Sequence, residues 1–143
     1  MKEYLNVLDE LNKGACMGVD SINYVLPYIN DKKLLKKLKR ELDEYNSIIK
    51  NISKIYSKFS DKEPHETNAM NKMMTWYGIQ MKTMTDDTTS KLSELLMQGT
   101  NMGIIEGRRL LNQNPEAEKD VKNILNDFVV MQEDSVETLK KYL

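Results

Sequence analysis

The apolar residues between positions 31 and 59 recur alternately every three and four residues, and this spacing restricts the possible folds more than any other feature. They are Leu35, Leu38, Leu42, Tyr45, Ile49, Ile52, Tyr56 and Phe59. An α-helix places such residues on one stripe, which is buried when the helix packs against other helices. Asn30 or Asp31 is suited to cap the N-terminus of this helix. The spacing predicts a helix over 31–59 that belongs to a helical bundle.

Two further segments of similar length carry comparable apolar stripes. We expect the first helix over about 2–29, with Pro27 disturbing its last turn. We expect the last helix over about 115–142, because Asn114 is suited to the N-cap and Pro115 to the first helical position. The inward line of this last helix is expected to be Val121, Ile124, Phe128, Gln132, Ser135, Leu139 and Tyr142. Strand-like alternation is hard to find anywhere, which indicates an all-α protein.

Residues 60–113 form a segment too long for one helix that matches the others. The apolar stripe stays in phase across "TDDTTS" at 85–90, so one alternative is a single helix over 66–112. The other is a break in these poor helix formers, and we favour it because a helix of about 45 residues would be roughly 70 Å long and overhang its neighbours. The third bundle helix is then expected over about 87–112. Residues 60–85 become a crossover that contains its own helix.

Four near-equal helices with a long connection between the second and third have the ferritin-like arrangement. The segment "SKLSELLMQGTNMGIIEGRRLLN" at 90–112, followed by a capped helix that ends in "VETLKKYL", resembles the second half of small, uncharacterised bacterial ferritin-like proteins. The resemblance implies one domain over 1–143. This domain is expected to be an antiparallel, ferritin-like four-helix bundle with a partly helical crossover between helices 2 and 3.

Three glycines spaced four residues apart, Gly99, Gly103 and Gly107, interrupt the third bundle helix. In the ferritin-like topology Gly14 of the first helix lies level with Gly99. The interpretation we favour is close packing of these two helices, against a hinge or a ligand cleft. Glu106 falls on the same buried line, and we expect its carboxylate to emerge near the helix end and pair with a basic residue such as Arg108 or Arg109.

The mid-bundle level is where a ferritin-like protein would bind two metal ions, and this chain lacks the usual ligands there. Such a centre uses Glu-x-x-His pairs, and this sequence contains none. Gln132 and Ser135 occupy the places of one such pair. Weak candidate metal ligands are Glu41, Glu94, Glu106 and Gln132. We expect no cofactor, and the alternative is a metal-binding or oxidoreductase bundle with a carboxylate-only site.

Charge and cysteine content exclude several other classes. With 21 basic and 22 acidic residues the chain has no net field that would recruit nucleic acid, although lysines cluster at 32–40. Cys16 is the single cysteine, so an intrachain disulfide and a four-thiolate zinc site are excluded. The start lacks the apolar core of a signal peptide, and no run is long enough for a transmembrane span. A cytoplasmic location is the expectation.

The segment 66–84 is rich in methionine and shows apolar residues on more than one side. We expect it to cover the bundle with one face while its other face is partly exposed, and the alternative is that the outer face is an adaptable surface for a partner chain or a small apolar ligand. The candidate contact residues are Met70, Met73, Trp76, Tyr77 and Met81. The predicted function is non-catalytic and acts through a protein partner or homo-oligomerisation. A ligand-binding bundle with this segment as its lid is a further hypothesis.

Overall fold

The described part of the chain consists of helices joined by turns and short irregular segments. The computed structural model describes residues 2–62, 64, 69–83 and 88–143, and these form five α-helices and no strand. The helices are α1 (Lys2–Val25), α2 (Lys32–Tyr56), α3 (Ala69–Thr83), α4 (Thr89–Gln113) and α5 (Lys119–Lys140), with a short 3₁₀ turn at Leu26–Tyr28. The predicted all-α class is confirmed over these ranges.

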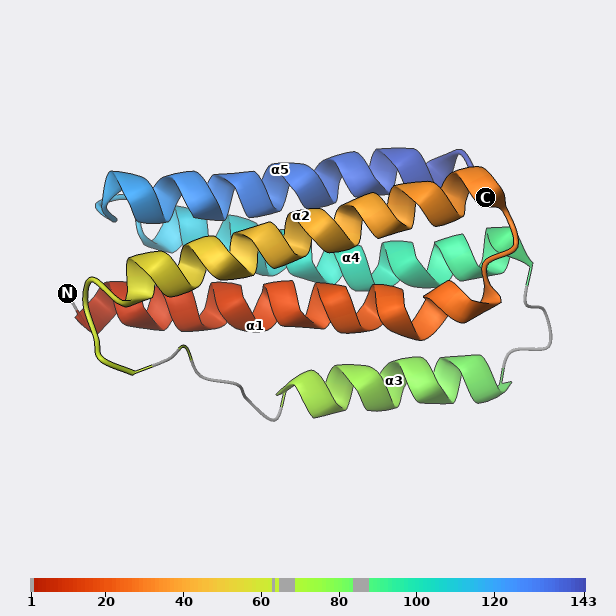
Figure 1. The fold of residues 1–143 in the computed structure, drawn as a ribbon, viewed down its shortest axis with the longest axis horizontal. Helices are drawn as coiled ribbons and strands as arrows, with labels where there is room; N and C mark the ends of the chain where they lie inside the picture. Colours follow the sequence, from red (N-terminus) through yellow and green to blue (C-terminus); the bar gives the residue numbers. More distant parts are fainter. Residues whose placement is uncertain (1, 63, 65–68, 84–87) are drawn as a thin grey trace.

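The four long helices lie side by side, and α3 lies outside them along α1 (Figure 1). We call α1, α2, α4 and α5 the bundle. Helices α1 and α5 run in one direction and α2 and α4 in the other, because the crossover that contains α3 returns the chain to the end where α2 began. The neighbouring pairs are α1 with α2, α2 with α5, α5 with α4, and α4 with α1.

Helix α2 begins and packs as its sequence predicts. The Asp31 carboxylate accepts a hydrogen bond from the Leu34 backbone N–H at 2.9 Å, which makes Asp31 the N-cap. Leu38, Tyr45, Ile52 and Tyr56 of the predicted stripe are buried, and the other members of the stripe are half-buried. A local period and a local cap were enough to locate this helix.

The ends of α1 and α5 differ from the prediction. Helix α1 stops at Val25, and Pro27 lies in the 3₁₀ turn that follows it. Helix α5 begins at Lys119 rather than at Pro115, because residues 115–117 form a separate turn. The Asn114 side chain does not cap α5, since its Nδ2 donates to the Leu110 carbonyl oxygen at the end of α4, at 2.9 Å.

The break between α3 and α4 is observed, so the single helix over 66–112 is wrong. Helix α3 ends at Thr83, and α4 starts at Thr89 and runs in the opposite direction (Figure 1). The Thr88 hydroxyl accepts a hydrogen bond from the Lys91 N–H at 3.3 Å and caps α4. Threonine is favourable at the N-cap of a helix and unfavourable inside a helix, which explains the break. Residues 84–87 lie outside the described part.

The inward face of α4 carries glycine, and this corrects the expectation for Glu106. Gly107 is buried, whereas Met102 is 41% exposed and Glu106 lies in solvent. Glu106 therefore does not lie on a buried line, although its predicted ion pair with Arg109 is formed. The interior is a single apolar core built from all five helices, and among the described residues no helix combines the length and the hydropathy of a membrane span.

Candidate functional site

A cavity of about 150 Å³ lies in the middle of the bundle and is enclosed by residues from all five helices. Its lining is mainly apolar side chains and glycine backbone, with a few polar groups. Helix α1 contributes Gly14, Met17, Gly18, Ser21 and Ile22; α2 contributes Leu38, Glu41 and Tyr45; α3 contributes Tyr77; α4 contributes Leu96, Gly99, Thr100, Met102 and Gly103; α5 contributes Gln132, Ser135 and Leu139. Met102 is partly exposed, so the cavity reaches the surface beside it.

Two glycines of α4 admit polar side chains from other helices into this cavity. A Cβ atom at Gly99 would overlap with the Tyr77 hydroxyl and lie 3.0 Å from its Cζ. A Cβ atom at Gly103 would overlap with the Gln132 amide nitrogen and lie 2.9 Å from its Oε1. Gly14 likewise faces the Phe128 ring of α5. The glycines therefore receive large side chains, and the expected close approach between Gly14 and Gly99 is wrong.

Two of the buried polar atoms in the cavity wall have no hydrogen-bond partner among the described residues. They are the hydroxyl of Tyr77, whose side chain is 0% exposed, and the Oε1 of Gln132, which is 2% exposed. Burial raises the pKa of Tyr77, and a side-chain interaction with Ser21 opposes this rise. Ser21 donates its own proton to the Met17 carbonyl at 2.7 Å, so it supplies no proton to the Tyr77 oxygen. Buried polar atoms are normally satisfied, so these two call for an explanation.

Tyr45 of α2 and Gln132 of α5 form a hydrogen bond with each other in the cavity wall. The Gln132 Nε2 donates to the Tyr45 hydroxyl oxygen in a long hydrogen bond of 3.4 Å. Burial raises the pKa of Tyr45 well above its usual range, so this hydroxyl is neutral at every ordinary pH. This hydrogen bond uses the amide nitrogen of Gln132, so the amide oxygen is the group that remains to accept a hydrogen bond.

Among the described residues that line the cavity, Glu41 is the one acidic residue, and its side chain is half-buried. Burial raises the pKa of its carboxyl group to about 7; a hydrogen bond with Ser135 opposes this rise, and the neighbouring Glu44 adds to it. None of the ion pairs between described residues includes Glu41. The cavity thus holds a carboxyl group that changes its charge near neutral pH without a basic side chain beside it.

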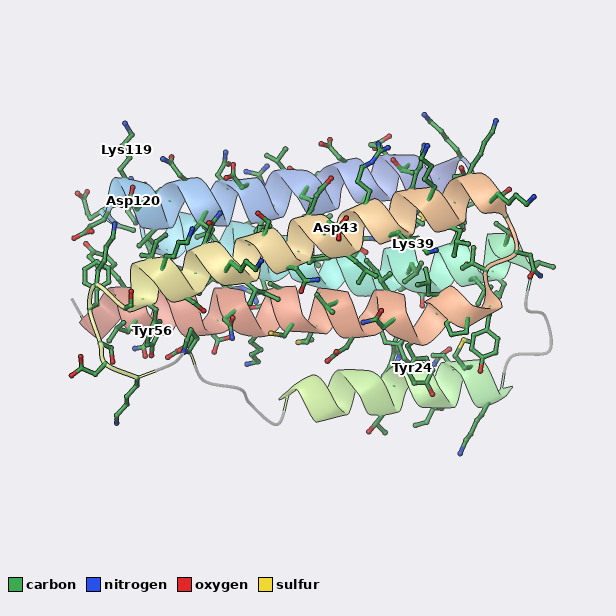
Figure 2. The ribbon with its side chains drawn as sticks, in the orientation of Figure 1. Tyr24, Lys39, Asp43, Tyr56, Lys119 and Asp120 are labelled. Atoms are coloured by element: carbon green, nitrogen blue, oxygen red, sulfur yellow. The ribbon has the colours of Figure 1, made fainter. Side chains whose placement is uncertain are left out.

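Helix α3 closes one side of the cavity through an aromatic contact with α1. The Tyr77 ring lies 6.4 Å from the Tyr24 ring and 4.9 Å from the Trp76 ring. Tyr24 lies on the side of α1 that faces α3 (Figure 2). The Tyr77 hydroxyl reaches past α1 to Gly99 of α4. This single side chain therefore joins the outer helix to the interior of the bundle.

We expect Gly99→Ala to displace α3. The added methyl group occupies the space of the Tyr77 hydroxyl, and a rigid ring can escape only if α3 moves with it. Overpacking of this kind costs about 1–3 kcal/mol, against a gain of about 1 kcal/mol in helix propensity. Trp76 is the only tryptophan, so its emission reports on α3 alone, and it should shift to longer wavelength and become more accessible to acrylamide.

Gly78→Ala is the matched control for this prediction. Its Cβ atom would lie 3.2 Å from the Tyr24 hydroxyl and makes no closer contact. The helix-propensity gain is the same, and the Trp76 emission should be unchanged. An unchanged emission in Gly99→Ala as well would show that Tyr77 does not hold α3 in place.

The structure brings together two of the four candidate metal ligands. Glu41 and Gln132 both line the cavity, whereas Glu94 is half-exposed and pairs with Lys91 at 2.7 Å, and Glu106 pairs with Arg109 in solvent. Within the described ranges, no group of three or more His, Cys, Asp or Glu residues is arranged to hold a metal ion. Among these four candidates, one carboxylate and one amide remain at the cavity.

The candidate contact residues of α3 are divided between core and surface. Tyr77 is buried in the cavity wall, so its side chain is not presented to a partner. Trp76 and Met81 are half-buried against the core. The side chains of Met70 and Met73 lie outside the described part. Tyr77 lay on the same helical stripe as these methionines, and that position was the available signal for an inward role.

Sequence analysis missed Met17, Ser21 and Thr100 as lining residues of the cavity. No motif marks them, because a cavity between helices forms where the side chains of several helices leave space unfilled.

Comparison with protein-family models, curated proteins and solved structures gives no match to this chain.

Proposed function

We propose that this protein is a small-molecule-binding bundle of ferritin-like arrangement, in which the central cavity holds an organic ligand and α3 covers it. The observation that carries this proposal is a pair of fully buried polar atoms, the Tyr77 hydroxyl oxygen and the Gln132 Oε1, which belong to residues that line a largely apolar cavity and which accept no hydrogen bond from a described residue. Ligand sites in proteins have this composition, with apolar walls and a few convergent polar groups.

The helix directions support the ferritin-like part of the proposal. Helices α2 and α4 are parallel because a crossover spans the length of the bundle between them (Figure 1). A single long crossover between the second and third bundle helices distinguishes this arrangement from an up-down-up-down bundle. In it, cofactor and ligand sites are built from inward side chains at mid-height, where Glu41, Tyr45 and Gln132 lie in this chain.

The size of the cavity limits the ligand. An apolar cavity of about 150 Å³ accommodates a molecule of benzene size. The ligand therefore has roughly six to eight non-hydrogen atoms, or is a longer molecule that extends through the opening beside Met102. Since α3 contributes Tyr77 and packs on the bundle from outside, movement of α3 is the simplest route of entry.

We expect benzene and cyclopentanol to raise the melting temperature. A ligand at ten times its dissociation constant stabilises the folded state by about 1.4 kcal/mol, which corresponds to roughly 3–6 °C for a chain of this size. Leu96→Phe should abolish the rise, because the larger ring fills the cavity that Leu96 lines. Ile105→Phe adds the same ring on an exposed position of α4 and should leave the rise intact.

A protein-contact role is the second candidate. The exposed apolar side chains Met102 and Ile105 lie three residues apart on one face of α4, and Ile79 is exposed on α3. If neither probe raises the melting temperature at any concentration, the ligand proposal fails. Self-association in sedimentation velocity that is lost in Ile105→Ser would then support the contact role.

A further inference from the structure

The chemical class of the ligand follows from the hydrogen-bonding groups left open in the cavity, and this inference rests on the proposed ligand site. Three of these groups accept hydrogen bonds: the Glu41 carboxylate, the Gln132 Oε1 and the Tyr77 hydroxyl oxygen. Gln132 already uses its Nε2 on Tyr45, so its remaining group is an acceptor. An interior rich in acceptors selects a ligand rich in donors.

The charge of the cavity points the same way. Among the described residues, no lysine, arginine or histidine lines it and none forms an ion pair with Glu41. A buried carboxylate without a counter-charge is costly, and a cationic ligand removes this cost. The rings of Tyr45 and Tyr77 in the wall add a favourable surface for a cation.

We propose that the cavity binds a small alkylammonium ion, with Glu41 as its counter-charge, Gln132 and Tyr77 as hydrogen-bond acceptors, and the apolar wall around its hydrocarbon part. An ammonium group has three N–H donors, which match the three acceptors. Gly99 and Gly103, which admit Tyr77 and Gln132, are one helical turn apart, so these two acceptors enter the cavity roughly 5–6 Å from each other. One small group is able to reach both.

The affinity for such a ligand depends on the ionisation of Glu41. Glu41 interacts with Glu44 and Tyr45 of α2 and with the neutral Ser135 of α5, and it shares the cavity wall with Gln132 of α5 and Tyr77 of α3, while the described side chains of α1 and α4 in this wall include no ionisable group. Because the pKa of Glu41 is about 7, a cation that needs the carboxylate binds more tightly as the pH rises from 6 to 8.

The test compares cyclopentylamine with cyclopentanol, which have the same carbon frame, by isothermal titration calorimetry on the full chain. The amine is fully protonated throughout this range, like a lysine side chain. At pH 8 we expect the amine to bind about tenfold more tightly than the alcohol, since a hydrogen bond to a charged group is stronger. Between pH 8 and pH 6 its affinity should fall about tenfold, whereas that of the alcohol should stay constant.

Two variants localise the effect. Glu41→Gln keeps the shape of the side chain and removes its charge, so it should abolish both the preference for the amine and the pH dependence. Asp43→Asn makes the same kind of change on the outer surface of α2 (Figure 2) and should behave like the wild-type protein. Binding of the alcohol verifies in each case that the variant has kept the cavity.

The possible outcomes separate the two proposals. If cyclopentanol binds and the amine binds no better, the ammonium inference is overturned and the ligand site stands. The same holds if the preference for the amine survives in Glu41→Gln. If neither compound binds, both the ligand site and the inference drawn from it fail.

Discussion

Phe128→Ala is expected to lower the free energy of unfolding by about 3–5 kcal/mol, as is typical when a buried aromatic side chain is truncated. Phe128 is 2% exposed, and its ring fills the space that Gly14 leaves on α1. It also packs edge-on against Tyr45, with ring centroids 6.3 Å apart. A glycine cannot close the resulting hole from the other side, so a cavity next to the proposed ligand site remains.

Urea unfolding followed by circular dichroism measures this loss, because a single domain of this size usually unfolds in one transition. Val130→Ala is the control, since Val130 lies on the same helix and is 43% exposed. Its effect should stay within about 0.5 kcal/mol. A loss below about 1 kcal/mol for Phe128→Ala would contradict the placement of this ring between α1 and α2.

Glu41→Gln is expected to stabilise the protein at alkaline pH and to leave it nearly unchanged at pH 5. Burial raises the pKa of Glu41 from 4.5 to about 7, so between these values the folded chain binds more protons than the unfolded chain. The free energy of unfolding therefore falls as the pH rises through this window. The full shift corresponds to roughly 3 kcal/mol at pH 8, a loss of stability that the neutral glutamine does not suffer.

The measurement is the difference in unfolding free energy between Glu41→Gln and the wild-type protein from pH 5 to pH 8. Taking the difference cancels the titration of every other carboxyl group. Asp43→Asn should give a flat difference over the same range, because Asp43 is exposed. A flat difference for Glu41→Gln would show that this carboxyl is solvated rather than buried.

The helices themselves were largely predictable from the sequence, because their signals are local. The period of the apolar residues and the Asp31 cap located α2 to within a few residues. The poor helix formers at 85–90 indicated the break before α4, and Thr88 provides the cap. Where two local signals competed, the prediction failed: Asn114 was expected to start α5, but it ends α4 instead.

The cavity was decided only by the tertiary structure. The spacing of Gly99 and Gly103 indicated that something approaches α4 closely, but the sequence does not identify which helix supplies the approaching group. In the folded chain these positions receive Tyr77 and Gln132, from α3 and α5. The same packing partly buries Glu41, which sequence analysis named only as a weak candidate metal ligand, and burial raises the pKa of its carboxyl group. Periodicity and caps depend on neighbours within one or two turns, whereas a cavity, its open polar atoms and a shifted pKa depend on side chains that only the packing of distant segments brings together.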